Sequence, residues 1–91
     1  MWYIYVVECS DSSLYCGITK DVESRVVKHN TGKGAKYTRA RKPVKLMGFS
    51  KVSASKSMAL KAEIAFKRLS KKKKNIYISR GLDSFLSSIQ E

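Results

Sequence analysis

Residues 2–19 of the chain read WYIYVVECSDSSLYCGIT, and this stretch decides the fold. Residues 2–7 are dense in aromatic and β-branched side chains, which favour a β-strand. Asp11, Ser12 and Ser13 form a turn cluster, and residues 14–19 resume the strand pattern. The sequence therefore predicts a β-hairpin with a loop of several residues.

A helix is expected directly after the hairpin. Asp21 suits a helix N-cap, because its carboxylate can accept a hydrogen bond from an amide two or three residues later. The helix is expected to end near residues 30–32, where Gly32 is a favoured terminating residue. The side chains expected to point towards the core are Val22, Val26 and Val27.

The rest of the chain adds one strand and more helix. Residues 33–42 form a polar, basic loop closed by Pro43, and residues 44–52 show the pattern of a third strand. Ser55 suits the N-cap of a second helix running to about Ser70. The expected apolar face of that helix consists of Met58, Ala62, Ala65, Phe66 and Leu69.

The C-terminal tail, from residue 71 onwards, is expected to be helical with an interruption at Gly81. Its first four residues are lysines, for which a solvated charged turn is the simplest interpretation. The order β-β-α-β-α-α predicts one α+β domain over residues 1–91, with a small three-stranded antiparallel sheet flanked by helices.

Charge is the strongest signal in the composition. The chain of 91 residues has 19 Lys and Arg against 7 Asp and Glu, a formal net charge of +12. This excess exceeds what solubility requires, and it indicates a polyanionic partner. Charge alone does not separate a nucleic-acid enzyme from a structural protein of ribosomal type, which would also be basic.

Membrane and metal-cluster classes are not favoured. The longest apolar run, residues 4–7, is far too short to span a bilayer, and no signal peptide is evident. Cys9 and Cys16 lack metal-binding spacing, so free thiols in a reducing compartment are expected. A cytoplasmic protein is the default expectation.

Two pairs of residues could carry chemistry. Tyr5 and Tyr15 fall on adjacent predicted strands, where each alone is a good packing residue but the two together could bind a phosphate or move a proton. Arg25 and His29 are four residues apart and share a helix face. A lone histidine is often merely solvated, but a fixed cation beside a proton-transfer group suits phosphodiester cleavage.

Glu63 is the acidic residue that could hold a metal. It could simply pair with Lys67, four residues later, for about 0.3–0.5 kcal/mol. A hard cation such as Mg²⁺ nevertheless needs only one or two protein carboxylates when water and substrate phosphate complete its shell. The basic loop adds an aromatic among cations, so that Tyr37 is expected to be free to stack on a base.

These residues together resemble the GIY-YIG nuclease family, in particular its small single-domain members of the UPF0213 type. The two name-giving motifs correspond to Tyr3-Ile4-Tyr5 and Tyr15-Cys16-Gly17, with Tyr3 in place of the first glycine and Cys16 in place of the second isoleucine. The following helix matches through Val22, Arg25, His29 and Asn30, and residues 32–38, Pro43 and Glu63 also fit. The resemblance covers residues 2 to about 70.

The resemblance implies a role for each matching residue. Tyr5 would act as the general base or help to form it, Tyr15 would hold the nucleophile or phosphate, and Arg25 would stabilise transition-state charge. His29 would assist proton transfer or be the base itself, and Glu63 would bind Mg²⁺ or Mn²⁺. Gly17 would permit close packing beneath Tyr15. The residues expected to contact nucleic acid are Gly17, Lys33, Lys36, Tyr37, Arg39 and Arg41.

The implied activity is a divalent-metal-dependent DNA endonuclease that selects single strands or DNA structure rather than sequence and leaves a 5′-phosphate and a 3′-hydroxyl. The alternative is a non-catalytic nucleic-acid-binding module on the same fold. A monomer is expected, and DNA repair, recombination or DNA uptake are reasonable contexts.

Overall fold

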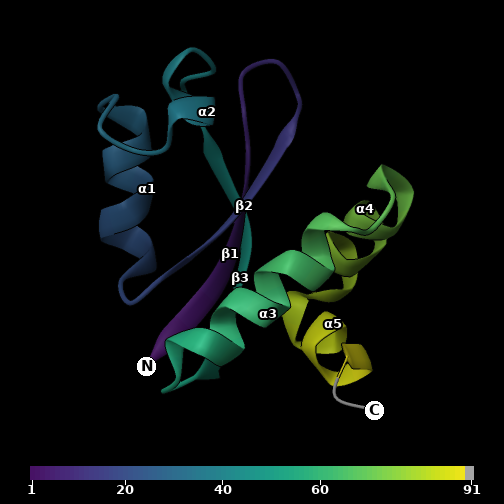
Figure 1. Ribbon diagram of the computed structural model, residues 1–91. Helices are drawn as coiled ribbons and strands as arrows, with labels where there is room; N and C mark the ends of the chain where they lie inside the picture. The colour runs from purple at the N-terminus through teal and green to yellow at the C-terminus, as the bar shows by residue number, and fades with distance from the viewer. Residues whose placement is uncertain (90–91) are drawn as a thin grey trace.

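The computed structural model describes residues 1–89 and has a three-stranded sheet with helices on both of its faces (Figure 1). The strands are β1 (Trp2–Glu8), β2 (Leu14–Thr19) and β3 (Lys45–Ser53). The helices are α1 (Val22–Asn30), α2 (Lys36–Arg39), α3 (Lys56–Lys67), α4 (Lys71–Arg80) and α5 (Leu82–Ile89). The predicted α+β class is confirmed. The predicted domain also includes residues 90 and 91, which lie outside the described residues.

The sheet is antiparallel throughout, in the order β2-β1-β3. The central strand β1 pairs with both neighbours, and Tyr5 lies opposite Gly17 on one side and Phe49 on the other. Both β2 and β3 are edge strands in this order. The hairpin predicted from residues 2–19 is therefore confirmed, and its second strand has an open edge.

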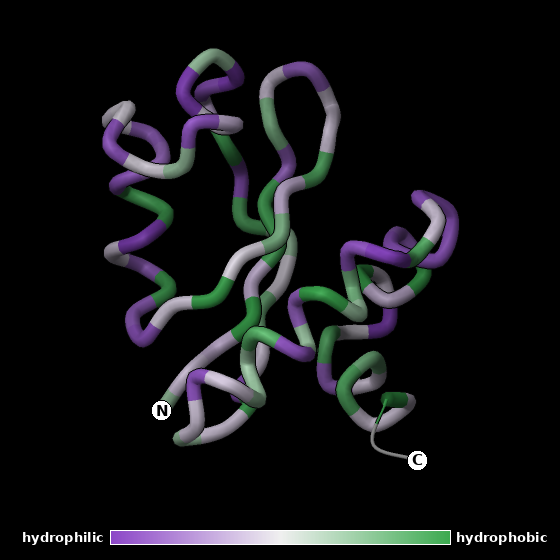
Figure 2. The backbone as a smooth tube through the Cα atoms, in the orientation of Figure 1, coloured by the Kyte–Doolittle hydropathy of each residue, from purple (hydrophilic) through white to green (hydrophobic). Residues whose placement is uncertain are grey.

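Two helical layers enclose the sheet. Figure 1 shows α1 and α2 on one side and α3, α4 and α5 on the other. Because side chains alternate along a strand, Ile4, Val6 and Cys16 pack with Ala62 and other residues of the α3–α5 layer. The other face forms a smaller cluster around Tyr5 and Val7, with contributions from Tyr15, Val22, Val26 and Leu46. Figure 2 shows hydrophobic segments both in the strands and in the helices that cover them.

Capping residues begin and end the helices largely as predicted. The carboxylate of Asp21 accepts from the amide of Ser24, and the hydroxyl of Ser55 accepts from the amide of Met58. The chain turns after α1 at Gly32, whose φ of 79° suits glycine. Gly81, with a φ of 102°, separates α4 from α5, so the interrupted helical tail is also confirmed.

Two core predictions are wrong by one position on a helix. The side chain of Val27 is 58% exposed, because successive helical residues point about 100° apart and Val26 already faces the sheet. Met58 is 49% exposed for the same reason, since the buried row of α3 is Ala59, Ala62 and Phe66. The predicted members Ala65 and Leu69 do pack against the core.

Three boundaries also differ from the expectation. The basic segment 33–42 is not wholly a loop, because residues 36–39 form the short helix α2. Helix α3 ends at Lys67 instead of near Ser70, and Ser70 caps α4 by accepting from the amide of Lys73. The four lysines thus form the first turn of a helix, and Lys71, Lys72 and Lys73 are exposed to solvent as the simplest interpretation expected. None of the helices within residues 1–89 is long and apolar enough to cross a membrane.

Candidate active site

The phenol of Tyr5 lies across strand β2 and makes Gly17 indispensable to the packing there. A Cβ atom built on Gly17 would lie 2.6 Å from the Tyr5 hydroxyl oxygen, closer than real Cβ atoms approach other atoms. Only glycine at this register position lets the Tyr5 ring pass over the neighbouring strand. Gly17 therefore provides room beneath Tyr5, whereas the resemblance had suggested packing beneath Tyr15.

A buried hydrogen-bonded chain joins Tyr5, His29 and Thr38. The Tyr5 hydroxyl oxygen lies 2.7 Å from Nε2 of His29, and Nδ1 of His29 lies 2.8 Å from Oγ1 of Thr38. All three side chains are buried. The histidine is therefore not a solvated surface residue, and residues separated by 33 positions in sequence form one continuous polar connection.

The partners of Thr38 determine the tautomer of His29. The Thr38 hydroxyl donates to the carbonyl oxygen of Ala35 at 2.9 Å, so towards His29 it can only accept. Nδ1 of His29 must then carry a proton and donate to Thr38. In the neutral ring Nε2 is left with a lone pair, and it accepts the hydrogen bond from the Tyr5 hydroxyl.

The segment between α1 and α2 closes tightly around the histidine. A Cβ atom at Gly34 would lie 2.3 Å from Nδ1 of His29 and 2.8 Å from its Cα atom. The amide side chain of Asn30 donates to the Val44 carbonyl oxygen and accepts from the Val44 amide, which fixes the end of α1 beside β3. These contacts hold His29 in one position against the sheet.

Burial and Arg25 together set the protonation of the pair. Burial raises the pKa of Tyr5 to about 12, although the positive charge of Arg25 acts in the opposite direction. Burial lowers the pKa of His29 below its ordinary value, and the charge of Arg25 lowers it further. At neutral pH the phenol is consequently protonated and the imidazole neutral. Arg25, half-buried one turn before His29, is thus close enough to act on both groups.

Tyr15 connects this chain to the basic loop. Its ring lies edge-on to His29 with centroids 5.4 Å apart and stacks on Tyr37 at 5.9 Å. The guanidinium of Arg41 lies 4.0 Å from the centre of the Tyr37 ring. Tyr37 is therefore in contact with Tyr15 and Arg41, while its side chain remains 38% exposed, so its stacking on a base stays a prediction.

Arg41 is also held by internal partners. It forms an ion pair with Asp11 at 3.0 Å and donates to the carbonyl oxygen of Tyr37 at 2.9 Å. These contacts join the tip of the β1–β2 hairpin to α2, so Arg41 helps to fix the loop that carries Thr38. The other predicted nucleic-acid contacts, Lys33, Lys36 and Arg39, are exposed on the same side of the sheet as α2.

Glu63 comes from the opposite helical layer. Its carboxylate pairs with Lys67 at 3.3 Å, as the simpler interpretation predicted, and its side chain is only 18% exposed. Its negative charge helps to raise the pKa of Cys16, while Lys67 lies 5.7 Å from the centre of the Tyr15 ring. Glu63 therefore lies near Cys16 of β2, and its partner Lys67 reaches the ring of Tyr15.

The side chains at the site could supply one carboxylate ligand, that of Glu63, to a weakly bound divalent cation. Within residues 1–89 no three His, Cys, Asp or Glu side chains gather as a complete metal site. A single half-buried carboxylate at a cationic edge is the protein contribution that Mg²⁺ accepts when phosphate and water supply its remaining ligands. Both cysteines are buried free thiols, as expected.

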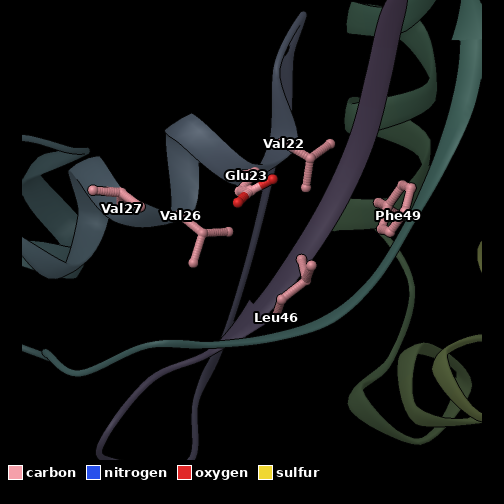
Figure 3. A pocket seen from close by; sticks show the side chains of 6 residues that line it. All are labelled: Val22, Glu23, Val26, Val27, Leu46 and Phe49. Carbon is pink, nitrogen blue, oxygen red and sulfur yellow. The ribbon is translucent and has the colours of Figure 1, made fainter.

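A separate apolar depression lies between α1 and β3. Figure 3 shows Val22, Val26 and Val27 of α1 on one side of it and Leu46 and Phe49 of β3 on the other. Glu23 is the single ionisable side chain in its lining. The depression has no acid–base pair, and neither Tyr5 nor His29 lines it.

Comparisons with known proteins agree with this fold. Residues 1–76 match the family model described as the GIY-YIG catalytic domain, and the chain belongs to the GIY-YIG family. Its relatives are small proteins of the UPF0213 group. One from Staphylococcus saprophyticus is 51% identical over 87% of this chain and 95% of its own length. One from Streptococcus agalactiae is 54% identical over 86% of this chain and 88% of its own.

Solved structures of the same group have a similar fold. The solution NMR structure of a UPF0213 protein from Bacillus halodurans is 40% identical, with a TM-score of 0.57, over 97% of this chain and 94% of its own. The solution NMR structure of a protein from E. faecalis is 44% identical, with a TM-score of 0.54, over 85% of this chain and 82% of its own. The family is one of nuclease-type domains, which makes a nucleic-acid substrate the natural inference.

Sequence patterns alone do not reveal every residue that shapes the site. Thr38 and Gly34 lie within the basic loop, where hydroxyl and glycine residues are common and carry no periodic signal. Lys67 was considered only as a partner of Glu63. The roles of Thr38 and Gly34 depend on the position of His29, which becomes evident only when α1 is packed against the sheet.

Proposed function

We propose that this protein is a divalent-metal-dependent DNA endonuclease whose proton acceptor is the Tyr5–His29 pair. The observation that carries the proposal is the 2.7 Å contact between the Tyr5 hydroxyl and Nε2 of His29, in the tautomer that Thr38 imposes. A neutral imidazole with its lone pair directed at a phenol is a proton acceptor ready for use.

The protonation states of Tyr5 and His29 indicate which of the two accepts the proton in the end. With a pKa of about 12, the Tyr5 phenol alone does not deprotonate water at neutral pH. His29 can accept the phenol proton as the phenol oxygen takes a proton from the attacking water. Tyr5 is then the relay and His29 the final acceptor, and no free phenolate needs to accumulate.

The bond changes follow from this relay. The water oxygen forms a bond to phosphorus, its proton passes to Tyr5, and the Tyr5 proton passes to Nε2 of His29. The bond from phosphorus to the 3′-oxygen breaks, and that oxygen takes a proton from solvent. Arg25 supplies positive charge to the phosphoryl oxygens as negative charge develops on them.

The remaining predicted residues have supporting roles in the proposal. Tyr15, which lies edge-on to His29, would orient the water or the phosphate. Glu63 would hold Mg²⁺ or Mn²⁺, which when bound supplies Lewis-acid stabilisation of the leaving oxygen. Lys33, Lys36 and Arg39 would contact the phosphate backbone, with Arg41 and Tyr37 shaping that surface from within.

Substrate choice is proposed to depend on DNA structure rather than sequence. The exposed groups near the site are cations, which bind phosphates without reading bases. Single-stranded or structured DNA is the expected target of a monomeric enzyme of this kind. Cleavage should therefore vary with strand structure and fall steeply with salt.

The decisive experiment is a cleavage assay on labelled single-stranded, duplex and branched DNA with Mg²⁺, Mn²⁺ or EDTA. Wild-type protein should cut in the presence of either metal, and the Glu63→Ala variant should bind without cutting. The matched control is Glu23→Ala, which removes an exposed carboxylate from α1 and should leave cleavage unchanged. Binding without cleavage by wild-type protein on all three substrates would instead identify a binding module.

A further inference from the structure

Helix α4 divides the four consecutive lysines at its start into two groups. The ammonium group of Lys71 donates to the carbonyl oxygen of Ser12 at the tip of the hairpin, at 3.4 Å. That of Lys74 lies 6.0 Å from the centre of the Phe66 ring of α3. Lys72 instead lines an outer depression with Asn75 and other residues of α4. Lys71 and Lys74, three residues apart, therefore face the sheet, while Lys72 and Lys73 point away from it.

The inner lysines continue a cationic line that starts at the candidate active site. Lys67 lies beside Tyr15 and Glu63, and its charge and that of Lys74 both act on the thiol of Cys16. Lys71 extends the line to Ser12. Lys67, Lys71 and Lys74, named here the lysine row, thus follow the open edge of β2 from Tyr15 to the hairpin tip.

The hairpin tip is bracketed by basic elements from both helical layers. The amide of Ser10 donates to the carbonyl oxygen of Arg41 on the α2 side, and Lys71 reaches Ser12 from the α4 side. Figure 1 shows the hairpin tip between α2 on one side and α4 on the other, and Figure 2 shows the hydrophilic character of α2 and of the start of α4. The lysine row therefore lies opposite the basic segment already proposed to contact phosphates.

The helix dipole does not favour lysines at this point. The first turn of a helix carries the positive end of the helix dipole, where cations are unfavourable and carboxylates are preferred. The first turn of α4 has no acidic residue. Within residues 1–89 the ion pairs are Arg41 with Asp11 and Lys67 with Glu63, so Lys71 and Lys74 have no acidic partner there. Their charge is available to an external anion.

We propose that the lysine row binds consecutive phosphates of the polynucleotide strand on one flank of the scissile phosphate, the flank that runs from Tyr15 towards the hairpin tip. This inference rests on the proposed function for the identity of the substrate. It assigns a specific path to the strand and separates Lys71 and Lys74 from the general positive charge of the chain. The lysine row recognises the phosphodiester backbone of the strand. The β2 edge along which it lies has no groups that read bases.

Binding of a labelled oligodeoxythymidine in EDTA tests the row independently of cleavage. The logarithm of affinity falls linearly with the logarithm of salt concentration, by about 0.7 for each phosphate neutralised on a single strand. Lys71→Ala/Lys74→Ala should therefore reduce the slope by about 1.4 and weaken binding at low salt. The matched control, Lys72→Ala/Lys73→Ala, removes the same charge from the same helical turn and should change the slope far less. Equal changes of the salt slope in both variants would contradict a specific role for the lysine row and would indicate only general electrostatic attraction.

A second pair of measurements separates binding from folding. Lys71→Ala/Lys74→Ala removes cations that oppose the helix dipole, but it also removes the Lys71–Ser12 hydrogen bond and the Lys74–Phe66 contact, so its melting temperature should stay close to that of the wild-type protein. Lys71→Arg/Lys74→Arg should retain the wild-type salt slope. Arginine variants that melt normally but bind as weakly as the alanine variants would contradict a phosphate-binding role.

The flank itself can be mapped once cleavage is observed. Substrates shortened on the side of the cut that contacts the row should lose their sensitivity to Lys71→Ala/Lys74→Ala, and substrates shortened on the other side should keep it. Equal sensitivity with both sets would show that the lysines do not follow one flank. If wild-type protein cuts no substrate, the proposed nuclease activity is wrong. The salt slopes of binding in EDTA still decide whether the lysine row binds phosphates.

Discussion

The Tyr5 hydroxyl lies 2.7 Å from Nε2 of His29, and both side chains are buried between β1 and α1. A buried tyrosine could serve packing alone, but here its polar end meets the free lone pair of a neutral histidine. The contact unites two of the expected catalytic residues, and the predictions below test what it does.

Removing the Tyr5 hydroxyl should abolish most cleavage while the protein stays folded. General acid–base groups typically contribute about 10²–10⁴-fold to rate, so Tyr5→Phe should lose at least about 10²-fold in kcat at every pH. The control is Tyr3→Phe, on the same strand, where the ring lies near Phe49 instead of His29. Initial rates on the preferred DNA substrate check both variants, and undiminished cleavage by Tyr5→Phe would exclude the relay.

Thr38 should act as a positioning residue that fixes the His29 tautomer. Thr38→Val keeps the shape of the side chain but leaves the Nδ1 proton of His29 without an acceptor, at a cost of about 1–3 kcal/mol in unfolding free energy. Without that acceptor the proton can move to Nε2, and the pair can no longer accept the Tyr5 proton. We expect a large fall in kcat with little change in DNA affinity.

Thr38→Ser supplies the comparison for that prediction, since it retains the hydroxyl and should restore activity. Nitrogen NMR shifts of the His29 ring report the tautomer directly and would not respond to a purely structural role. A wild-type tautomer and normal kcat in Thr38→Val would show that Thr38 serves packing only.

The sequence predicted the frame of the site well because that frame rests on local patterns. The strand composition of residues 2–19, the caps at Asp21 and Ser55 and the break at Gly81 are each determined within a few residues of chain. The sequence placed Tyr5 and Tyr15 on adjacent strands, and the pairing in the structure puts both tyrosines on one face of the sheet.

The remaining features depend on packing, which local patterns do not describe. Whether Val26 or Val27 faces the sheet is decided by a rotation of about 100° along α1. The burial of His29 requires the segment after α1 to fold back over it, and the role of Thr38 follows only from that contact. The partition of the lysines on α4 likewise needs the position of the hairpin.

Gly17 of β2 should be far less tolerant of substitution than Gly48 of β3, which lies on the other side of the central strand β1. A Cβ atom at Gly17 would overlap the Tyr5 phenol, while one at Gly48 would make an ordinary 3.6 Å contact with Leu82. Gly17→Ala should displace Tyr5, destabilise the fold by about 1–3 kcal/mol and reduce cleavage sharply. Gly48→Ala should retain activity. Chemical denaturation and cleavage rates check both, and equal activity in the two variants would mean that the Tyr5 position is not critical.

The lowered pKa of His29 predicts coupled changes in activity and stability with pH. Its pKa is depressed from 6.5 in the folded state, so the unfolded chain binds a proton more readily. The stability contributed by neutral His29 is complete above pH 6.5 and is lost as the pH falls through the folded-state pKa. Cleavage should decline over the same range, because a protonated imidazole cannot accept the Tyr5 proton.

Melting temperatures and single-turnover rates measured across this range test that coupling. In the wild-type protein, the melting temperature and the cleavage rate should fall together on acidification. In His29→Gln, the melting temperature should depend less on pH, and little cleavage should occur at any pH. A wild-type rate that stayed constant below the pH at which stability falls would mean that His29 is not the final proton acceptor. The base would then have to be sought elsewhere at the β2 edge.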